Sequence, residues 1–310
     1  MTNHNSNHTL PGIAENWIIE GNPKSAIGLS LVALLIIFTL IIFEKFSRRK
    51  SKRWSENPAS KDSQGWELKK TRALLAIIIS LFPPIFSFGI PCFWVLLNID
   101  QIQKGLSIEL LNLAFRTISL GFFTALITML FSLIISLARR PNKSLFLGLI
   151  TNLAGLGYAI PGTVLALSLI SISSSKFNFI AICLLIWGYL VRFLTISKGS
   201  IDSSLERISP SLDEAALGLG NNRLEIIKKI HLPLLKGPIF VGSLLVFVDT
   251  IKELPITFIL RPFDFDTLSV RIYQYAGDER MVEAILPAII IMTLGLIASI
   301  TLIPSLEKKN

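Results

Sequence analysis

The sequence predicts an all-α fold, a polytopic transmembrane helical bundle. Of its 310 residues, 51% are hydrophobic and only 16% are charged, whereas a soluble domain carries about 25% charged residues. Several apolar runs reach the length of about 18 residues that a helix needs to cross a bilayer core. Because lipid offers the backbone no hydrogen-bonding partners, and these runs do not alternate apolar and polar residues, we expect each run to form a helix.

Seven runs are long and apolar enough to be candidate spans. They cover residues 26–43, 73–97, 113–138, 145–171, 179–197, 239–260 and 284–303. The fourth run is the least regular, because Pro161-Gly162 interrupts its helical pattern. We expect residues 1–72 to form an external tail, a first transmembrane helix and a basic cytoplasmic linker, and residues 73–310 to form the main transmembrane domain.

The segments that connect these runs divide into a basic set and a set with few cations. The basic set holds 21 of the 30 Lys and Arg residues, and the other set holds 6. The basic set comprises residues 44–72, 139–144, 198–238 and 304–310. Because basic loops remain in the cytoplasm, we expect this set inside, with the N-terminus outside and the C-terminus inside. The net charge of +9 therefore indicates membrane orientation rather than a nucleic-acid partner.

The sequence lacks the motifs of an enzyme that carries out its own chemistry. No Gly-Lys dipeptide occurs, so a P-loop for ATP cannot form. No Gly-x-Ser-x-Gly or His-Glu-x-x-His motif occurs; His4 and His8 lie in the N-terminal tail, and His231 is isolated. Cys92 and Cys183 lie in apolar runs, as small hydrophobic residues do. We therefore expect no catalytic residue, metal or cofactor in this chain, and an energy source in a partner or a gradient.

The loop at residues 198–238 is predicted to form two short helices at the membrane surface. The run Ser211-Leu212-Asp213-Glu214 has a capping-box pattern, in which the serine caps the first helix and the glutamate reaches back. Gly220 then follows as a breaker of that helix. A second, amphipathic helix over roughly residues 223–230 is expected to end before Pro233. This arrangement of helix, turn and helix is a docking platform for a cytoplasmic partner.

The same loop resembles a known family motif. Glu214-Ala215-Ala216 is followed after three residues by Gly220, after nine more by Ile230, and after one more by Leu232-Pro233. This spacing is similar, at every defining position, to the EAA loop of binding-protein-dependent ABC importer permeases. In that family the loop fits a cleft on the ATPase subunit, which binds the ATP. The resemblance implies that Glu214 pairs with this partner, that the two alanines permit close approach, and that Gly220 supplies the bend.

Further motifs resemble the ferric-iron type of these permeases over roughly residues 70–305. They include Tyr158-Ala159-Ile160-Pro161-Gly162, Lys252-Glu253-Leu254-Pro255 and Leu260-Arg261-Pro262-Phe263. These motifs are less defining than the EAA loop, because thiamine, polyamine and sulfate permeases are related. The resemblance implies import of ferric iron delivered by an external binding protein, with thiamine, a polyamine or an anion as alternatives.

The fused form of this family carries two permease halves in one chain, and this sequence resembles the second half. Span 26–43 and its linker are similar to the last helix of the first half. The other half is then a separately encoded chain, a second copy of this chain in a homodimer, or a part lost by truncation. The resemblance implies a multi-pass protein of the bacterial inner membrane, in contact with a cytoplasmic ATPase, an external binding protein and the lipid bilayer.

Ionisable residues inside the predicted span 239–260 are candidates for the pathway or its gate. Asp249, Lys252 and Glu253 are spaced to share one helix face, and charges inside a membrane usually face a bundle interior or water. Alternatively, Asp249 and Lys252 neutralise each other near the outer end of the span. The helix break at Pro161-Gly162 is a further candidate for the pathway.

Other charged residues have simpler expected roles. Arg192 lies near the inner end of its span, and we expect its side chain to extend to the cytoplasmic surface. The outer loop 261–283 carries carboxylates and tyrosines, whose oxygens suit a hard ferric ion. In the family that this sequence resembles, a separate binding protein holds the metal, so we expect this loop to serve in docking.

Two other functional classes remain open at this point. A secondary transporter often carries paired broken helices, and Pro161-Gly162 with Lys252-Glu253-Leu254-Pro255 would be such a pair, although the flanking residues show no repeat. A truncated membrane scaffold that does not transport would also explain the lack of catalytic motifs.

Overall fold

A computed structural model of the chain describes residues 68–100, 107–141, 144–172 and 178–307, together with isolated residues between 28 and 43. The predicted external tail and most of the basic linker lie outside the described residues. The first predicted span, 26–43, is described only in part, so neither this span nor the predicted boundary at residue 72 is tested.

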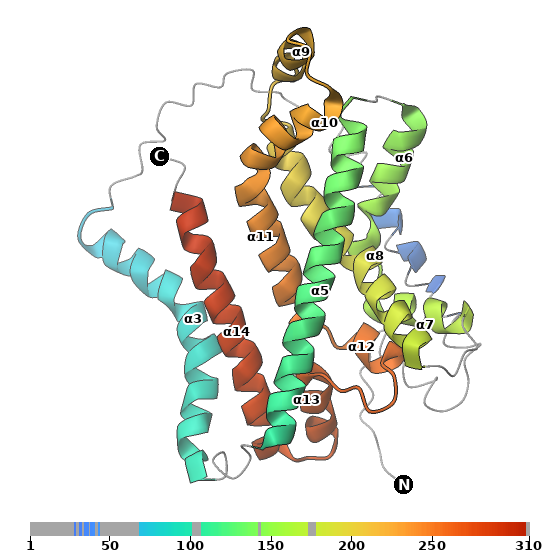
Figure 1. The fold of residues 1–310 in the computed structure, drawn as a ribbon. Coiled ribbons are helices and arrows are strands. Elements are labelled where there is room, and N and C mark those ends of the chain that lie inside the picture. The colour runs from blue at the N-terminus through green and yellow to red at the C-terminus, as the bar shows by residue number, and fades with distance from the viewer. Residues whose placement is uncertain are drawn as a thin grey trace.

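The described part of the chain is helical and confirms the predicted all-α bundle (Figure 1). Within the described residues, five helices are long and apolar enough to cross a membrane, or up to six spans are possible if a bent pair counts as one. The five long helices are α3 (Thr71–Leu97), α5 (Ile108–Arg139), α8 (Asn178–Leu205), α11 (Leu232–Ile251) and α14 (Met281–Glu307). They correspond to five of the predicted runs, and the predicted total of seven is not confirmed.

The irregular fourth run is the bent pair. It consists of α6 (Leu145–Ala154), a 3-10 turn at Gly157–Ala159, and α7 (Gly162–Ile172). The chain bends by 111° between the two parts. Pro161 causes the break, because it has no N–H to donate and its ring clashes with the preceding helical turn. The residue before it, Ile160, is accordingly extended.

Prolines also place two helix ends differently from the prediction. The predicted span 239–260 is not one helix, because α11 ends at Ile251 and a short separate helix, α12 (Pro255–Leu260), follows. Pro255 occupies the first position of α12, where no N–H is needed, so a new helix begins there. By contrast, Pro233 does not end the second loop helix. Helix α10 (Arg223–Ile226) continues through a π turn, η2 (Ile227–His231), into α11, and this wider turn accommodates the hydrogen bond that proline cannot make.

Helices α5, α8 and α11 pack against one another and form the core of the described bundle (Figure 1). Tyr189 and Phe193 of α8 and Val246 of α11 are fully buried between them. Small residues allow this close packing, because a Cβ added to Gly121 of α5 would lie only 2.9 Å from the ring of Phe247. Helix α3, in contrast, has no buried residue and contacts α14.

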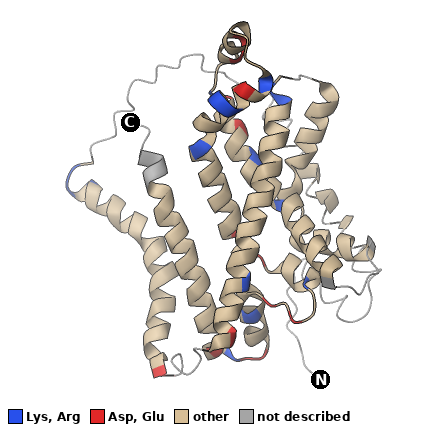
Figure 2. Cartoon of the chain, in the orientation of Figure 1, with Lys and Arg blue, Asp and Glu red and all other residues tan. Residues whose placement is uncertain are grey.

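Charged residues of the described part gather mainly at the two ends of the bundle (Figure 2). Helix α9 (Pro210–Gly218) projects from one end, next to the connection between α5 and α6. Helix α13 (Leu268–Gly277), which belongs to the predicted outer loop, lies at the opposite end. The fold therefore separates the predicted inner loops from the predicted outer loop.

Candidate functional site

Helix α9 and the turn after it form the exposed tip of the 198–238 loop. The N-cap of α9 is Ser209, whose hydroxyl accepts a hydrogen bond from the N–H of Ser211 at 3.3 Å. The prediction of Ser211 as the cap is wrong, because Pro210 occupies the first helical position, where no N–H is needed. Glu214 therefore lies beyond the third helical position that a capping box uses, and its side chain is exposed.

A capping box occurs instead at the start of α10. The Asn222 side chain accepts a hydrogen bond from the N–H of Glu225, and the Glu225 carboxylate accepts one from the N–H of Asn222, both at 2.9 Å. Between the two helices, Gly220 has a φ of +86°, a left-handed conformation that favours glycine. A Cβ added there would meet no described atom within 4 Å. The bend is thus set by backbone conformation rather than by packing.

The tip presents apolar side chains at the surface. Two of the predicted coupling residues, Glu214 and Ala215, are exposed, whereas Ala216 faces inward and is buried. Leu219 is 83% exposed and Leu224 is 68% exposed. Exposed apolar side chains at a charged end of a protein are typical of an interaction surface.

The remaining predicted coupling residues lie at the base of the loop. Ile230 belongs to the π turn, and Leu232 and Pro233 begin α11. Ile230 and Leu232 are half-buried. These residues join the exposed tip to a core helix, and of the three only Pro233 is exposed.

A polar contact that the sequence motifs did not indicate holds the tip against the bundle. The Nε of Arg140, the residue after α5, lies 2.5 Å from Oδ2 of Asp213 in α9. The Nε2 of His231 in the π turn lies 3.2 Å from Oδ1 of the same aspartate. A cavity of about 930 Å³ lies beside this contact, between α5 and the two loop helices. No sequence signal pointed to this pairing, because Arg140 and Asp213 are 73 positions apart.

The predicted pathway residues separate into two groups in the structure. In the first, Glu253 lies beside the break at Pro161-Gly162 and contacts Arg192, with 3.6 Å between Nε and Oε2. A Cβ added to Gly162 would lie 2.8 Å from both Nη1 of Arg192 and Oε1 of Glu253. Arg192 also donates a hydrogen bond to the carbonyl of Ile160 at 3.2 Å. The expectation that Arg192 extends to the cytoplasmic surface is wrong, because this buried carboxylate and carbonyl hold it inside the bundle.

Asp249 and Lys252 form the second group. The Nζ of Lys252 lies 2.7 Å from Oδ1 of Asp249, and the lysine side chain is 59% exposed. Because α11 ends at Ile251, Glu253 leaves the helix, and the prediction that it shares a face with these two residues is wrong. The geometry agrees with the alternative in which Asp249 and Lys252 neutralise each other.

The outer loop 261–283 does not gather its carboxylates into a metal site. Asp266 contacts both Arg261 and Arg271, and Arg271 also lies 2.8 Å from Glu109 of α5. Within the described residues, no group of three or more His, Cys, Asp and Glu side chains is placed to hold a metal ion. Arginines therefore occupy the position beside Asp266 that a ferric ion would need.

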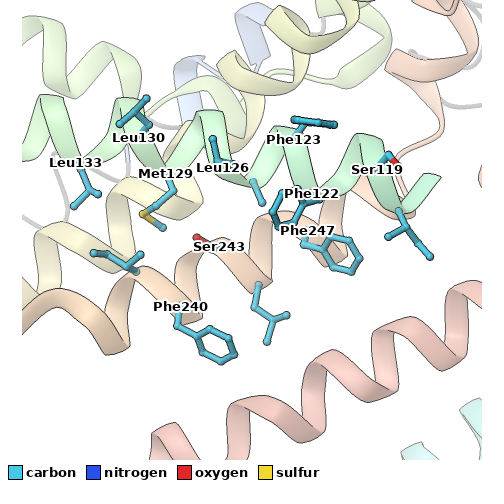
Figure 3. Close-up of a pocket in the computed structure, with 14 residues that line it drawn as sticks. Ser119, Phe122, Phe123, Leu126, Met129, Leu130, Leu133, Phe240, Ser243 and Phe247 are labelled. Carbon is cyan, nitrogen blue, oxygen red and sulfur yellow. The ribbon is translucent and has the colours of Figure 1, made fainter. Parts of the chain in front are cut away.

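A further feature is an apolar pocket of about 800 Å³ that is lined by residues of α5 and α11 (Figure 3). Its lining is aromatic and aliphatic except for Ser119 and Ser243. The large side chains that line it include Phe122, Leu126, Met129, Phe240 and Phe247. The cavity beside the loop shares Leu130 and Leu133 with this pocket. The apolar face thus extends along α5 to the exposed tip.

Comparison with characterised proteins shows relatives among ferric permeases. The chain is 25% identical over 282 residues to the Fe(3+)-transport system permease protein FbpB 2 of Haemophilus influenzae, which is 88% of this chain and 55% of that protein. It is 30% identical over 105 residues to the ferric transport system permease protein FbpB of Actinobacillus pleuropneumoniae, which is 34% of this chain and 14% of that protein. The matched region spans about half the length of the first relative.

Two solved structures have a similar fold. One is a bacterial alginate ABC transporter in complex with a periplasmic protein that holds an alginate pentasaccharide; the TM-score is 0.58 at 15% identity, over 75% of this chain and 92% of that chain. The other is a bacterial ABC transporter that imports alginate, with a TM-score of 0.58 at 16% identity, over 77% of this chain and 96% of that chain. At these identities the likeness shows the fold alone.

The family assignment comes from a match that covers the 198–238 loop. The family model of the binding-protein-dependent transport system inner membrane component matches residues 132–309, more than half of the chain. This region contains both the 198–238 loop and the break at Pro161-Gly162. The chain belongs to this family of multi-pass inner-membrane transport components.

Proposed function

We propose that the chain is a permease half of an ATP-driven, binding-protein-dependent importer and carries no ATPase site of its own. The observation that carries this proposal is the exposed apolar tip of the 198–238 loop. The tip combines the sequence of the EAA motif with a projecting helix, α9, and a left-handed bend at Gly220. A cytoplasmic ATPase subunit would bind this tip, hold the ATP and move the loop as it closes.

Alternating access is the proposed mechanism. The loop continues without interruption through α10 and the π turn into α11, so a displacement of the tip reaches a core helix directly. Because α11 packs against α5 and α8, these helices would tilt together as one body. The pathway would then open in turn to the outside and to the inside.

Ferric iron is the proposed substrate, with thiamine, a polyamine or an anion as the alternatives. Relatives whose names specify ferric transport support iron. In the outer loop, Asp266 is already paired with Arg261 and Arg271, and the role proposed for this loop is docking of an external iron-carrying protein. Iron is therefore cargo that passes through the assembly, and no resident cofactor is proposed for this chain.

A second transmembrane half is the proposed occupant of the apolar face of α5 and α11. Lipid can cover a smooth apolar face, but the pocket in this one (Figure 3) is large enough to receive bulky side chains from another helix. Helix α3 has no buried residue, so it too has surface available to a partner. A permease half of this kind, whether separately encoded or a second copy of this chain, would fit this face.

The group around Pro161, Gly162 and Glu253 is proposed as a fixed element of the gate and not as a contact for the substrate. Glu253 is only 7% exposed and is engaged by Arg192. The Glu253→Gln variant removes the negative charge of this side chain and keeps its shape. Uptake that persists in this variant would exclude a role for the charge along the pathway.

Reconstitution in proteoliposomes tests the assignment. With a candidate ATPase and a ferric binding protein, the wild-type chain should bind the ATPase and import iron in an ATP-dependent manner. Gly220→Asp places a charged side chain in the left-handed bend, so uptake and ATPase stimulation should fall while membrane insertion persists. Unchanged uptake would refute the coupling role of the tip.

The same assay separates the alternative classes. Import that stops with an ionophore but persists when ATP is removed would identify a secondary transporter. Import that depends on neither, or no import by any assembly, would favour a scaffold. Crosslinking between two differently tagged copies of the chain would identify the homodimer.

A further inference from the structure

The side chain of Arg140 joins three helices at the base of the exposed tip. Besides the Nε contact with Asp213, its Nη1 donates a hydrogen bond to the carbonyl of Leu205 at 2.8 Å. Its Nη2 donates to the carbonyls of Ile208 at 3.0 Å and Ser209 at 3.3 Å. Leu205 is the last residue of α8, and Ser209 is the N-cap of α9. One guanidinium therefore ties the end of α5 to the end of α8 and to the start of α9.

These contacts require an arginine. The carbonyls at the C-terminus of a helix carry partial negative charge and attract a cation. A planar guanidinium can donate to a carboxylate and to several carbonyls at once, whereas an ammonium group is a point charge without that fork geometry. The neighbouring Arg139 is exposed, so only the second arginine of the pair is drawn into the loop.

The partner of this arginine also faces α11. The carboxylate of Asp213 contacts Arg140 through one oxygen, and its other oxygen lies 3.2 Å from Nε2 of His231, which is 3% exposed. His231 is the last residue of the π turn that leads into α11. Asp213 is thus the point at which α9 meets elements connected to α5, α8 and α11.

The inner and outer surfaces of α9 have different roles. Asp213 and Ala216, three positions apart, face the bundle, and Ala216 is 7% exposed. Leu212 is 47% exposed, and Glu214 and Ala215 are exposed as well. A partner can therefore hold the outer surface of α9 while the inner surface stays attached to the core helices.

From this geometry we propose that Arg140, acting through Asp213, is the positioning residue that transmits movement of α9 to the transmembrane helices. The inference rests on the proposed function, because it requires an ATPase that moves the tip. Without the guanidinium, α9 would keep its chain connection to α10 and the contact of Asp213 with His231, but it would lose its tie to the ends of α5 and α8. The ATPase could then still bind, but its closing motion would reach these two helices less fully.

The test uses the complete complex with its ATPase and binding protein in proteoliposomes. Arg140→Gln should bind the ATPase subunit with an affinity within about threefold of wild type, while iron uptake falls about tenfold and the number of ATP molecules hydrolysed per ion rises to match. Arg140→Lys keeps the positive charge but lacks the planar guanidinium with its several donors, so iron uptake should fall about threefold. The double variant Arg140→Gln/Asp213→Asn should lose little more uptake than Arg140→Gln alone, because both changes remove the same contact between Arg140 and Asp213.

Arg139→Gln is the matched control, since it removes an adjacent exposed cation, and its uptake and coupling ratio should equal those of wild type. Unchanged uptake and an unchanged ratio in Arg140→Gln would overturn the proposal. A parallel loss of ATPase affinity and uptake at a constant ratio would also overturn it, because Arg140 would then only maintain the docking surface. Failure of the wild-type chain to bind any ATPase would instead contradict the proposed function, so the two failures are distinguishable.

Discussion

Two arginine–carboxylate contacts in this protein join elements that are far apart in the sequence. Arg140 and Asp213 hold the loop at one end of the bundle, and Arg192 and Glu253 lie inside it. Gly220, in the loop that the first contact holds, has open space around it, whereas Gly162 is packed against both charged groups of the second contact. The Arg192–Glu253 contact, inside the bundle, fixes the fold around the helix break. The Arg140–Asp213 contact, at the end of the bundle, leaves a surface that a partner can reach.

The largest effect on stability is expected from breaking the contact between Arg192 and Glu253 inside the bundle. Arg192→Leu leaves the carboxylate of Glu253 buried without its cation, which should cost about 3–5 kcal/mol of unfolding free energy. The double variant Arg192→Leu/Glu253→Leu removes both charges and should recover most of that loss. Thermal unfolding in detergent, followed by intrinsic fluorescence, measures both variants. If the single and double variants have equal stability, the contact does not stabilise the helix break.

A smaller effect on stability is expected from adding a methyl group at Gly162, where the packing is close. Gly162→Ala places a Cβ 2.8 Å from Arg192 and Glu253, and such overpacking costs about 1–3 kcal/mol. Gly199→Ala in α8 is the control, because a Cβ there meets no described atom within 4 Å; it should be neutral or stabilising by up to about 1 kcal/mol. The same unfolding assay applies, and equal midpoints for the two variants would contradict the close packing at Gly162.

A substitution at Gly220, in the bend at the loop tip, should change the stability of the protein less than a substitution at Gly162. Gly220→Ala forces a Cβ into a left-handed conformation, which costs about 1 kcal/mol, but no neighbouring atom is displaced. We expect iron uptake to fall while the unfolding midpoint hardly changes. Gly199→Ala, in α8 and outside the tip, controls for the added methyl group and should keep full uptake. A large loss of stability in Gly220→Ala would remove the contrast between the two glycines.

The smallest effect is expected at the exposed pair in α11. Asp249→Asn removes the partner of a lysine that is 59% exposed, and exposed pairs contribute at most about 1 kcal/mol. Stability and uptake should both stay near wild type, as measured by thermal unfolding and iron import. A strong loss of uptake with normal stability would place Asp249 back among the pathway residues.

Features that depend on near neighbours in the chain were predictable from the sequence. The five long helices follow from apolar length, and the left-handed bend at Gly220 follows from the lack of a Cβ. The errors arose where two local signals competed. Ser211 resembled a cap, but Pro210 moved the helix start to Ser209. Pro233 resembled a terminator, but the π turn carried the helix past it.

By itself, the sequence determined the helical fold class, the long apolar helices and the loop motif that identifies the family, because helix formation in lipid and the conformation of a turn are properties of short segments. Only the tertiary structure decided which charges meet. Arg192 pairs with Glu253 instead of extending to the surface, and Arg140 reaches Asp213 across 73 positions. Electrostatic attraction depends on distance through space, and helix packing sets that distance.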